Sequence, residues 1–329
     1  MTKTFLIWLL VIFFVANVSV AQAQQPGKIL RIGFLDVSNA SGTAGLLETF
    51  RQELRKLGWI EGKNFTVEYR FAEQKSERLP ELAADLVRLK VDLIVAVATP
   101  AALAAKSATT TIPILIVGAG DPVATGLVAS LARPGGNVTG FSTLGPELNT
   151  KRLEILKDAV PKLARVGLLR SPGTGIMSDL QLKELRAAAL ALKLKLEEIK
   201  TQPDPKSLES AFQTAKQKQV GAIMTIPTRP FLAERKWIVE LAVKYRLPAI
   251  YPQKEYVDAG GLMSYGVDYD DLLRGAAGYV DKILKGAKPA DLPVQQAMRF
   301  EFIISLKAAK QIGHTIPFEL LARANQVVK

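Results

Sequence analysis

The sequence predicts an α/β protein of two lobes, each a doubly wound parallel sheet covered by helices. Runs of strand type alternate with amphipathic helical runs along most of the chain, an order typical of parallel sheets with helices on both faces. Several strand-type runs, such as Leu93–Val97, are short and continuously apolar, as buried parallel strands are. The pattern restarts after Thr143–Pro146, which indicates a second sheet.

The expected elements follow in chain order. The strand-type segments are Ile29–Leu35, Phe65–Phe71, Asp92–Ala98, Ile114–Gly118, Val138–Phe141, Arg165–Leu169, Leu194–Ile199, Ala222–Ile226 and Leu262–Tyr265. The helical segments are Gly45–Leu57, Glu77–Leu89, Pro100–Ala108, Glu147–Val160, Asp179–Leu192, Asp204–Lys218, Arg229–Tyr245 and Asp270–Lys285. Within Glu77–Leu89 the apolar residues recur at helical spacing, so one face of this helix would cover a sheet.

The expected lobes are discontinuous in the chain. One crossing is predicted near Gly145, and two Gly- and Pro-rich passages, Ala259–Gly261 and Lys285–Pro293, are interpreted as two more. The first lobe would then contain residues 28–144 and 262–288, and the second lobe residues 145–261 and 289–329. Three crossings between two lobes would form a hinge.

The first 23 residues have the layout of a cleavable secretory signal peptide. Lys3 gives a positive start, Phe5–Ala16 is unbroken apolar sequence, and Ala21–Ala23 is a small-x-small cleavage signal. The apolar run is too short to span a bilayer, although an uncleaved anchor stays an alternative. We therefore expect cleavage after Ala23 and a soluble periplasmic protein.

Composition narrows the possible functions. The chain is 48% hydrophobic and 22% charged, typical of a globular core, and it contains no cysteine, which excludes disulfides, thiol catalysis and cysteine metal sites. The net charge of +12 is spread along helices without a basic arm, which favours a solvated surface over nucleic-acid binding. His314 is the single histidine. We expect no enzyme activity, metal or cofactor, although carboxylates alone could still hydrolyse a glycoside.

Loops after the predicted strands carry the candidate ligand-binding residues. In open parallel sheets ligands bind at the carboxyl ends of the strands, and helix starts there present free N–H groups to an anion. Helix capping is the competing interpretation of each loop, and core packing is that of the tyrosine. The candidates are Ser38, Asn39, Thr99, Asp121, Ser171, Thr228, Gln253 and Tyr265.

Six motifs resemble one known family. They are Leu57–Asn64, Arg78–Ala83, Thr99–Lys106, Gly120–Val128, Leu131–Gly140 and Gly260–Gly266. In this order they resemble the substrate-binding proteins of ABC transporters of the tryptophan/tyrosine-uptake type, which have a periplasmic-binding-protein type I-like fold. The resemblance covers nearly all of the chain after residue 23. It does not name the ligand.

This resemblance implies two α/β lobes that close on a small molecule between them, like a Venus flytrap, and deliver it to an ABC permease. We expect the protein to be a monomer. If the ligand is an amino acid, we expect Ser38 and Thr99 to bind its carboxylate and Asp121 its ammonium group, with Tyr265 lining the side-chain pocket. Two alternatives stay open: a receptor that presents occupancy to a membrane sensor, and a secreted hydrolase.

Overall fold

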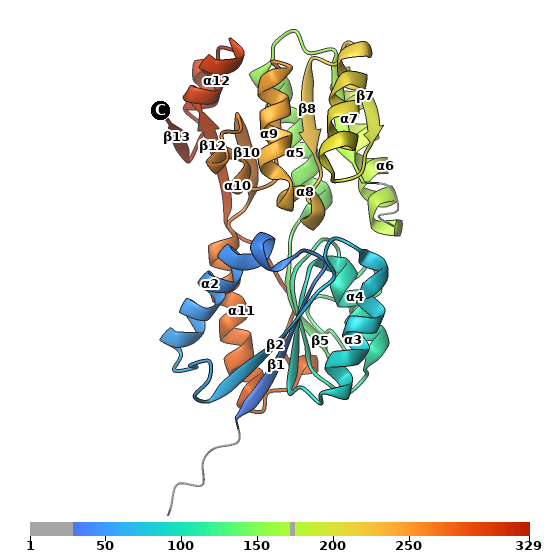
Figure 1. The fold of residues 1–329 in the computed structure, drawn as a ribbon, viewed down its shortest axis with the longest axis vertical. Coiled ribbons are helices and arrows are strands. Elements are labelled where there is room, and N and C mark those ends of the chain that lie inside the picture. The colour runs from blue at the N-terminus through green and yellow to red at the C-terminus, as the bar shows by residue number, and fades with distance from the viewer. Residues whose placement is uncertain (1–28, 172–174) are drawn as a thin grey trace, which may run out of the picture.

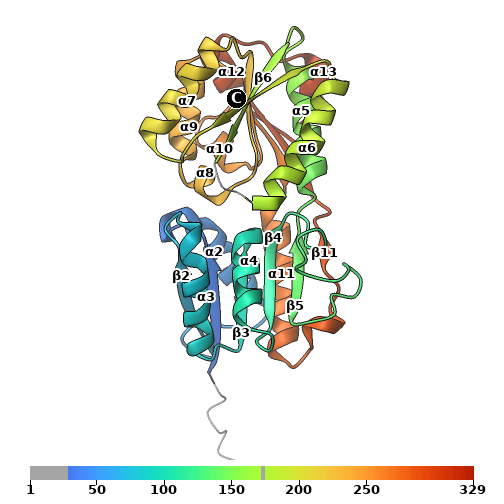
Figure 2. The same cartoon turned by 90° about the vertical axis from the view of Figure 1, so that its right-hand side faces the viewer.

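The computed structural model describes residues 29–171 and 175–329, which form two lobes, each built on its own sheet. Figures 1 and 2 show one lobe above the other. In both views α11 (Tyr269–Leu284), drawn in orange, lies in the same lobe as the blue N-terminal elements. Each lobe is therefore assembled from segments far apart in the chain.

The first sheet has the strand order β11-β5-β4-β3-β1-β2, and all of its neighbouring strands are parallel. Its strands are β1 (Leu30–Asp36), β2 (Phe65–Phe71), β3 (Leu93–Val97), β4 (Ile114–Ala119), β5 (Val138–Ser142) and β11 (Gln295–Gln296). Its helices are α2 (Ala40–Lys56), α3 (Leu79–Arg88, after a 3₁₀ turn at Ser76–Arg78), α4 (Ala98–Ala108) and α11. Apolar residues of α2 and α11 share one core, and those of α3 and α4 share another.

The second sheet has the order β13-β12-β10-β9-β8-β6-β7, with one antiparallel pair, β10 and β12. Its strands are β6 (Arg165–Arg170), β7 (Lys195–Lys200), β8 (Ala222–Thr225), β9 (Ala249–Tyr251), β10 (Met263–Val267), β12 (Phe300–Ser305) and β13 (Gln326–Val328). Its helices are α5 (Gly145–Ala159), α6 (Gly175–Ala191), α7 (Pro205–Gln217), α8 (Arg229–Ala233), α9 (Arg235–Lys244), α10 (Glu255–Asp258), α12 (Leu306–Ile312) and α13 (Phe318–Leu321). A short 3₁₀ turn, Pro289–Asp291, precedes β11.

The apolar patterns explain why these segments form layers. All five residues of β3 are buried, because helices cover both faces of its sheet. On α3 the buried residues are Leu79, Leu82, Ala83 and Leu86, which follow helical spacing and face that sheet. The two-lobe α/β fold class predicted from the sequence is confirmed.

Two of the predicted lobe boundaries are wrong. β10 pairs with β9 and β12, so residues 263–267 belong to the second sheet and not to the first lobe. β11 pairs with β5, so residues 295–296 belong to the first sheet and not to the second lobe. The chain changes lobe after β5, after β10 and between β11 and β12. The Gly- and Pro-rich passages at 259–261 and 285–293 are turns within a lobe, before the crossings.

Smaller differences concern single elements. The expected helix 229–245 is two helices, α8 and α9, which meet at Glu234. β9, β11, β12 and β13 were not expected. The expected signal peptide lies outside the described residues. Among the residues that the structure describes, no helix has the length and apolar character needed to cross a membrane.

Candidate functional site

The carboxyl ends of the strands of the two sheets face each other. Within the first sheet, β1, β3 and β4 are parallel, so the loops that carry Ser38, Thr99 and Asp121 leave the same edge. In the second sheet β6, β8 and β9 are parallel, so the loops that begin at Ser171, Ile226 and Pro252 share one edge. Hydrogen bonds from Arg229, which follows β8, to Asp36, at the end of β1, join these two edges across the region between the lobes.

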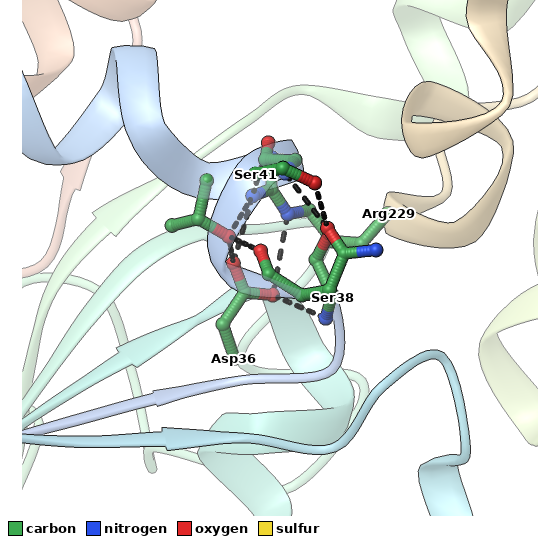
Figure 3. Close-up of polar contacts among 7 residues, drawn as sticks. Asp36, Ser38, Ser41 and Arg229 are labelled. Atoms are coloured by element: carbon green, nitrogen blue, oxygen red, sulfur yellow. Dashed lines mark hydrogen bonds and ion pairs between the residues drawn. The ribbon is translucent and has the colours of Figure 1, made fainter.

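Asp36 and Arg229 form a buried ion pair between the lobes (Figure 3). Arg229 Nη2 lies 2.7 Å from Asp36 Oδ2, and Nε donates to Oδ1 at 3.2 Å. The side chains are 0% and 9% exposed respectively. Burial lowers the pKa of Arg229, but the Asp36 charge and hydrogen bonds outweigh it and raise that pKa above its ordinary value. Neither residue was a candidate from the sequence, although Asp36 ends an apolar strand and Arg229 follows a candidate cap.

Ser38 and Asn39 lie beside this ion pair, at the start of α2. Asn39 Oδ1 accepts from the Gly42 amide at 2.7 Å and from Ser41 Oγ at 3.0 Å, so it caps the helix. The Ser38 amide donates to Asp36 Oδ1 at 3.1 Å. Its hydroxyl is buried and has no hydrogen-bond partner among the described residues.

Thr99 and Asp121 both make local hydrogen bonds in the first lobe. Thr99 Oγ1 accepts from the Gly120 amide at 3.2 Å and so joins the loops after β3 and β4. Asp121 Oδ1 accepts from the amides of Val123 and Ala124, at 3.0 and 2.9 Å, so this carboxylate stabilises its own turn. Ala98, between β3 and Thr99, has a φ of +64°, a left-handed conformation that stores strain at this edge.

Among the candidates of the second lobe, Thr228 caps α8 by accepting from the Phe231 amide at 3.3 Å. Gln253 is buried in the loop after β9, and Ser171 directly follows β6. The Tyr265 ring on β10 packs on Phe300 and Phe302, at centroid distances of 6.5 and 6.1 Å. The structure thus places Thr228 beside the ion pair, whereas Tyr265 lies nearer the hinge.

A fully buried arginine, Arg152 of α5, lies where the chain crosses between the lobes. It is 1% exposed. Nη1 donates to the carbonyl oxygen of Tyr265 at 2.8 Å and Nη2 donates to Asn149 Oδ1, but Nε has no hydrogen-bond partner in the described part of the chain. Within residues 29–171 and 175–329 no carboxylate forms an ion pair with it; the ionisable groups that act on it are Tyr269 and Tyr265. Burial lowers the pKa of Arg152 to about 10.

Tyr269 connects this arginine with the ion pair. It is the first residue of α11, directly after the second crossing, and is partly exposed. A Cβ on Gly118 of β4 would lie 3.4 Å from its ring, so the ring rests against the first lobe. Arg229, Arg152 and Asp36 all act on it electrostatically. The charges of two guanidinium groups and of two carboxylates, those of Glu255 and Asp36, therefore act on Tyr269.

Two α/β lobes whose strand ends face each other across a hinge are the architecture of two-lobed solute-binding proteins. The family model described as "ABC transporter substrate binding protein" matches residues 39–328. The chain belongs to this family, as the sequence motifs indicated. Proteins of this family bind a small molecule outside the cytoplasm and serve an ABC transporter permease.

Similar proteins agree with this assignment. A curated tyrosine-binding protein of Clostridioides difficile is 30% identical over 80% of this chain and 75% of its own length. A conserved domain protein of Vibrio cholerae has a TM-score of 0.83 at 30% identity, covering 91% of this chain and 100% of its own. A Streptococcus ABC domain in complex with L-Trp has a TM-score of 0.81 at 28% identity, covering 92% and 100%.

A third solved structure is less similar to this protein than the Vibrio and Streptococcus structures are. It is the ligand-free, open structure of a Clostridium difficile substrate-binding protein with adhesive properties. Its TM-score is 0.63 at 26% identity, and the match covers 92% of this chain and 99% of that one. At nearly the same coverage and identity, the present structure is therefore closer to the L-Trp complex than to the open form.

Proposed function

We propose that this protein captures an amino acid between its lobes in the periplasm and passes it to an ABC permease. In this proposal it is a monomer without catalytic activity, and the mature chain begins after Ala23. Tyrosine and L-Trp, bound by similar proteins, are the first ligands to test. The observation that carries the proposal is the buried guanidinium of Arg152 at the hinge, which forms no ion pair with a carboxylate of the described residues.

A buried cation without an anionic partner is costly, because desolvation is not repaid by an opposite charge. An amino-acid carboxylate would supply that charge, and guanidinium groups bind carboxylates in fixed geometry. We therefore assign the ligand carboxylate to the Arg152 side of the hinge, next to Tyr269. The Ser38 hydroxyl is a second donor, whereas the Asp121 carboxylate, already bonded to two amides, is a weaker candidate for the ammonium group.

Ligand binding and closure would be linked. A ligand that contacts both lobes binds the closed form more tightly and shifts the population towards it. The strand-end loops with Ser38 belong to the first lobe and Arg152 to the second, so an amino acid bound by both would bridge the lobes. The permease would then recognise the closed arrangement.

Calorimetric titration of the mature protein tests the ligand class. We expect L-Trp or L-Tyr to bind, and the carboxamides L-tryptophanamide and L-tyrosinamide to bind at least tenfold more weakly. Arg152→Gln removes a charged hydrogen-bond donor, worth about 1.5–3 kcal/mol, so acid binding falls by about tenfold or more and the preference over the amide shrinks.

Arg165→Gln is the matched control, because Arg165 also donates from Nη1 to a backbone carbonyl but lies away from the hinge. It should leave both affinities unchanged. Equal affinity for acids and amides in the wild-type protein would contradict the assignment of a carboxylate to Arg152. Failure of every amino acid to bind would reject the proposed ligand class itself.

The proposed location is tested separately. We expect the protein expressed from its full-length gene in a Gram-negative host to appear in the periplasmic fraction, with Gln24 as its first residue by intact mass. Replacing Leu9 and Leu10 with Arg would break the apolar run and leave the chain in the cytoplasm. A full-length mass in the membrane fraction would instead support an uncleaved anchor.

A further inference from the structure

The buried ion pair between Asp36 and Arg229 joins the two lobes directly, through side chains of the protein alone. Asp36 ends β1 in the first lobe, and Arg229 begins α8 in the second. The two side chains meet at two points, at 2.7 and 3.2 Å, and exclude solvent almost completely. The contact therefore exists only while these edges of the two lobes are together.

Arg229 depends on the first lobe for its hydrogen bonds. Besides Asp36, its Nη2 donates to Thr43 Oγ1 at 3.1 Å and to the Gly42 carbonyl at 3.4 Å. Across the described residues, every hydrogen bond of this guanidinium goes to the first lobe. Separation of the lobes would remove all of them at once.

Asp36 is held in place by its own lobe. Its carboxylate accepts from the Ser38 amide at 3.1 Å and from Thr43 Oγ1 at 2.9 Å (Figure 3). A buried ion pair repays its desolvation only when further hydrogen bonds support both partners, and here both Asp36 oxygens and the Nε and Nη2 atoms of Arg229 make such bonds. The Asp36–Arg229 pair therefore favours the conformation in which the two lobes are together.

A second ion pair near the hinge, Lys254–Asp270, is weaker. Lys254 Nζ lies 2.7 Å from Asp270 Oδ2, but the two side chains are 31% and 49% exposed. Water screens such a pair, and exposed pairs contribute little. The buried pair is thus the stronger electrostatic link across this side of the molecule.

We propose that Asp36 and Arg229 form a latch that keeps a substantial share of the protein closed before any ligand binds. The structure is closer to the L-Trp complex than to the open relative, so the ion pair belongs to the closed arrangement of the lobes. The latch lowers the free energy that the ligand must supply to close the lobes, and this tightens binding. It does not depend on which ligand the protein carries.

The test measures the distance between the lobes without ligand. Because the chain has no cysteine, Ala44→Cys on α2 and Lys236→Cys on α9, exposed positions in different lobes, can be spin-labelled cleanly. We expect pulsed EPR of the otherwise wild-type protein to show a prominent short-distance population. Asp36→Asn and Arg229→Met should each lower the ratio of short to long distances at least tenfold.

The double variant Asp36→Asn/Arg229→Met should open the lobes no further than either single variant, because both remove the same contact. Asp158→Asn, which breaks an exposed pair with Arg323 within the second lobe, is the control and should leave the distances unchanged. Circular dichroism checks folding, and Arg229→Lys, which keeps the charge but loses the two-point contact, gives a milder second variant.

Distances that stay the same in Asp36→Asn, Arg229→Met and Arg229→Lys would overturn the latch. So would a wild-type protein that shows only the long distance without ligand. Since no ligand is present, neither result bears on amino-acid binding. Conversely, a failure of L-Trp and L-Tyr to bind would leave the distance measurement valid.

Discussion

Gly266, at the end of β10, has no space for a side chain. A Cβ there would lie 1.8 Å from the Pro252 carbonyl oxygen, which is backbone and cannot move aside cheaply. We expect Gly266→Ala to lower the free energy of unfolding by about 3 kcal/mol, at the upper end of overpacking costs. In α11, Gly278→Ala is the matched control: nothing lies within 4 Å of its Cβ position, so a helix gain of about 0.5–1 kcal/mol is expected.

Urea unfolding followed by circular dichroism measures both changes. A Gly266→Ala variant as stable as the wild type would show that the loop after β9 can move away from β10. That outcome would also weaken the claim that the hinge end of β10 is closely packed.

At the scale of single residues, the sequence was informative about caps and silent about buried charge. Asn39 and Thr228 follow strands and are residue types that accept from helix amides, so their place could be predicted. Arg152 follows Lys151 on an amphipathic helix, and two adjacent charged residues predict a solvent-exposed position. Its burial depends on Tyr265, more than a hundred residues later, and no local pattern carries that information.

At the scale of elements, a charge cluster holds β6, β7 and α6 together. Glu198 of β7 accepts from Arg170 Nη1 of β6 and from Arg186 Nε of α6, both at 2.9 Å. Burial raises the pKa of Glu198, but these two arginines outweigh it and lower that pKa below its ordinary value. Because the folded state binds this proton less tightly than the unfolded state, the cluster stabilises the fold above the unfolded pKa.

We therefore expect Glu198→Gln to lower the melting temperature at pH 7. The loss should be modest, equivalent to about 1 kcal/mol or less, since the groups are partly exposed. The difference from the wild type should shrink as the pH falls through the pKa of Glu198 in the folded state. Thermal melts between pH 7 and pH 3 measure this, and a constant difference over that range would show that charge is not the cause.

The elements that could be predicted from the sequence are those with a strong local pattern. The continuous apolar runs of β3 and β4 and the amphipathic face of α3 identified them without tertiary information. β11 and β13, of two and three residues, have no such pattern. They are strands only because β5 and β12 present free edges to them.

At the scale of the whole molecule, the number of lobes followed from the repeated strand–helix order, but two crossings were misplaced. Gly and Pro mark turns, and the prediction took turns for crossings. The structure shows turns within a lobe at 259–261 and 285–293, whereas the chain crosses after β10 and after β11. Which sheet a strand joins is decided by partners such as β5 and β12, not by the residues beside it.

This interleaving predicts that the first lobe cannot fold from its N-terminal segment alone. A fragment of residues 29–144 lacks α11, whose buried residues Leu272, Leu273, Ala276, Ala277, Tyr279, Val280 and Ile283 complete one of the two cores. Without them, the buried face of α2 would be left in water, so we expect a fragment without cooperative unfolding.

Adding residues 268–297 through a Gly/Ser linker should restore the fold, because it supplies α11 and β11. Trp59 reports the docking, since it is the one tryptophan of the fragment and its Nε1 donates to Asp281 Oδ1 of α11 at 2.9 Å. We expect its fluorescence to show a cooperative urea transition in the linked form only. A cooperative transition in residues 29–144 alone would mean that α2 and the sheet suffice, and that α11 joins a lobe already formed.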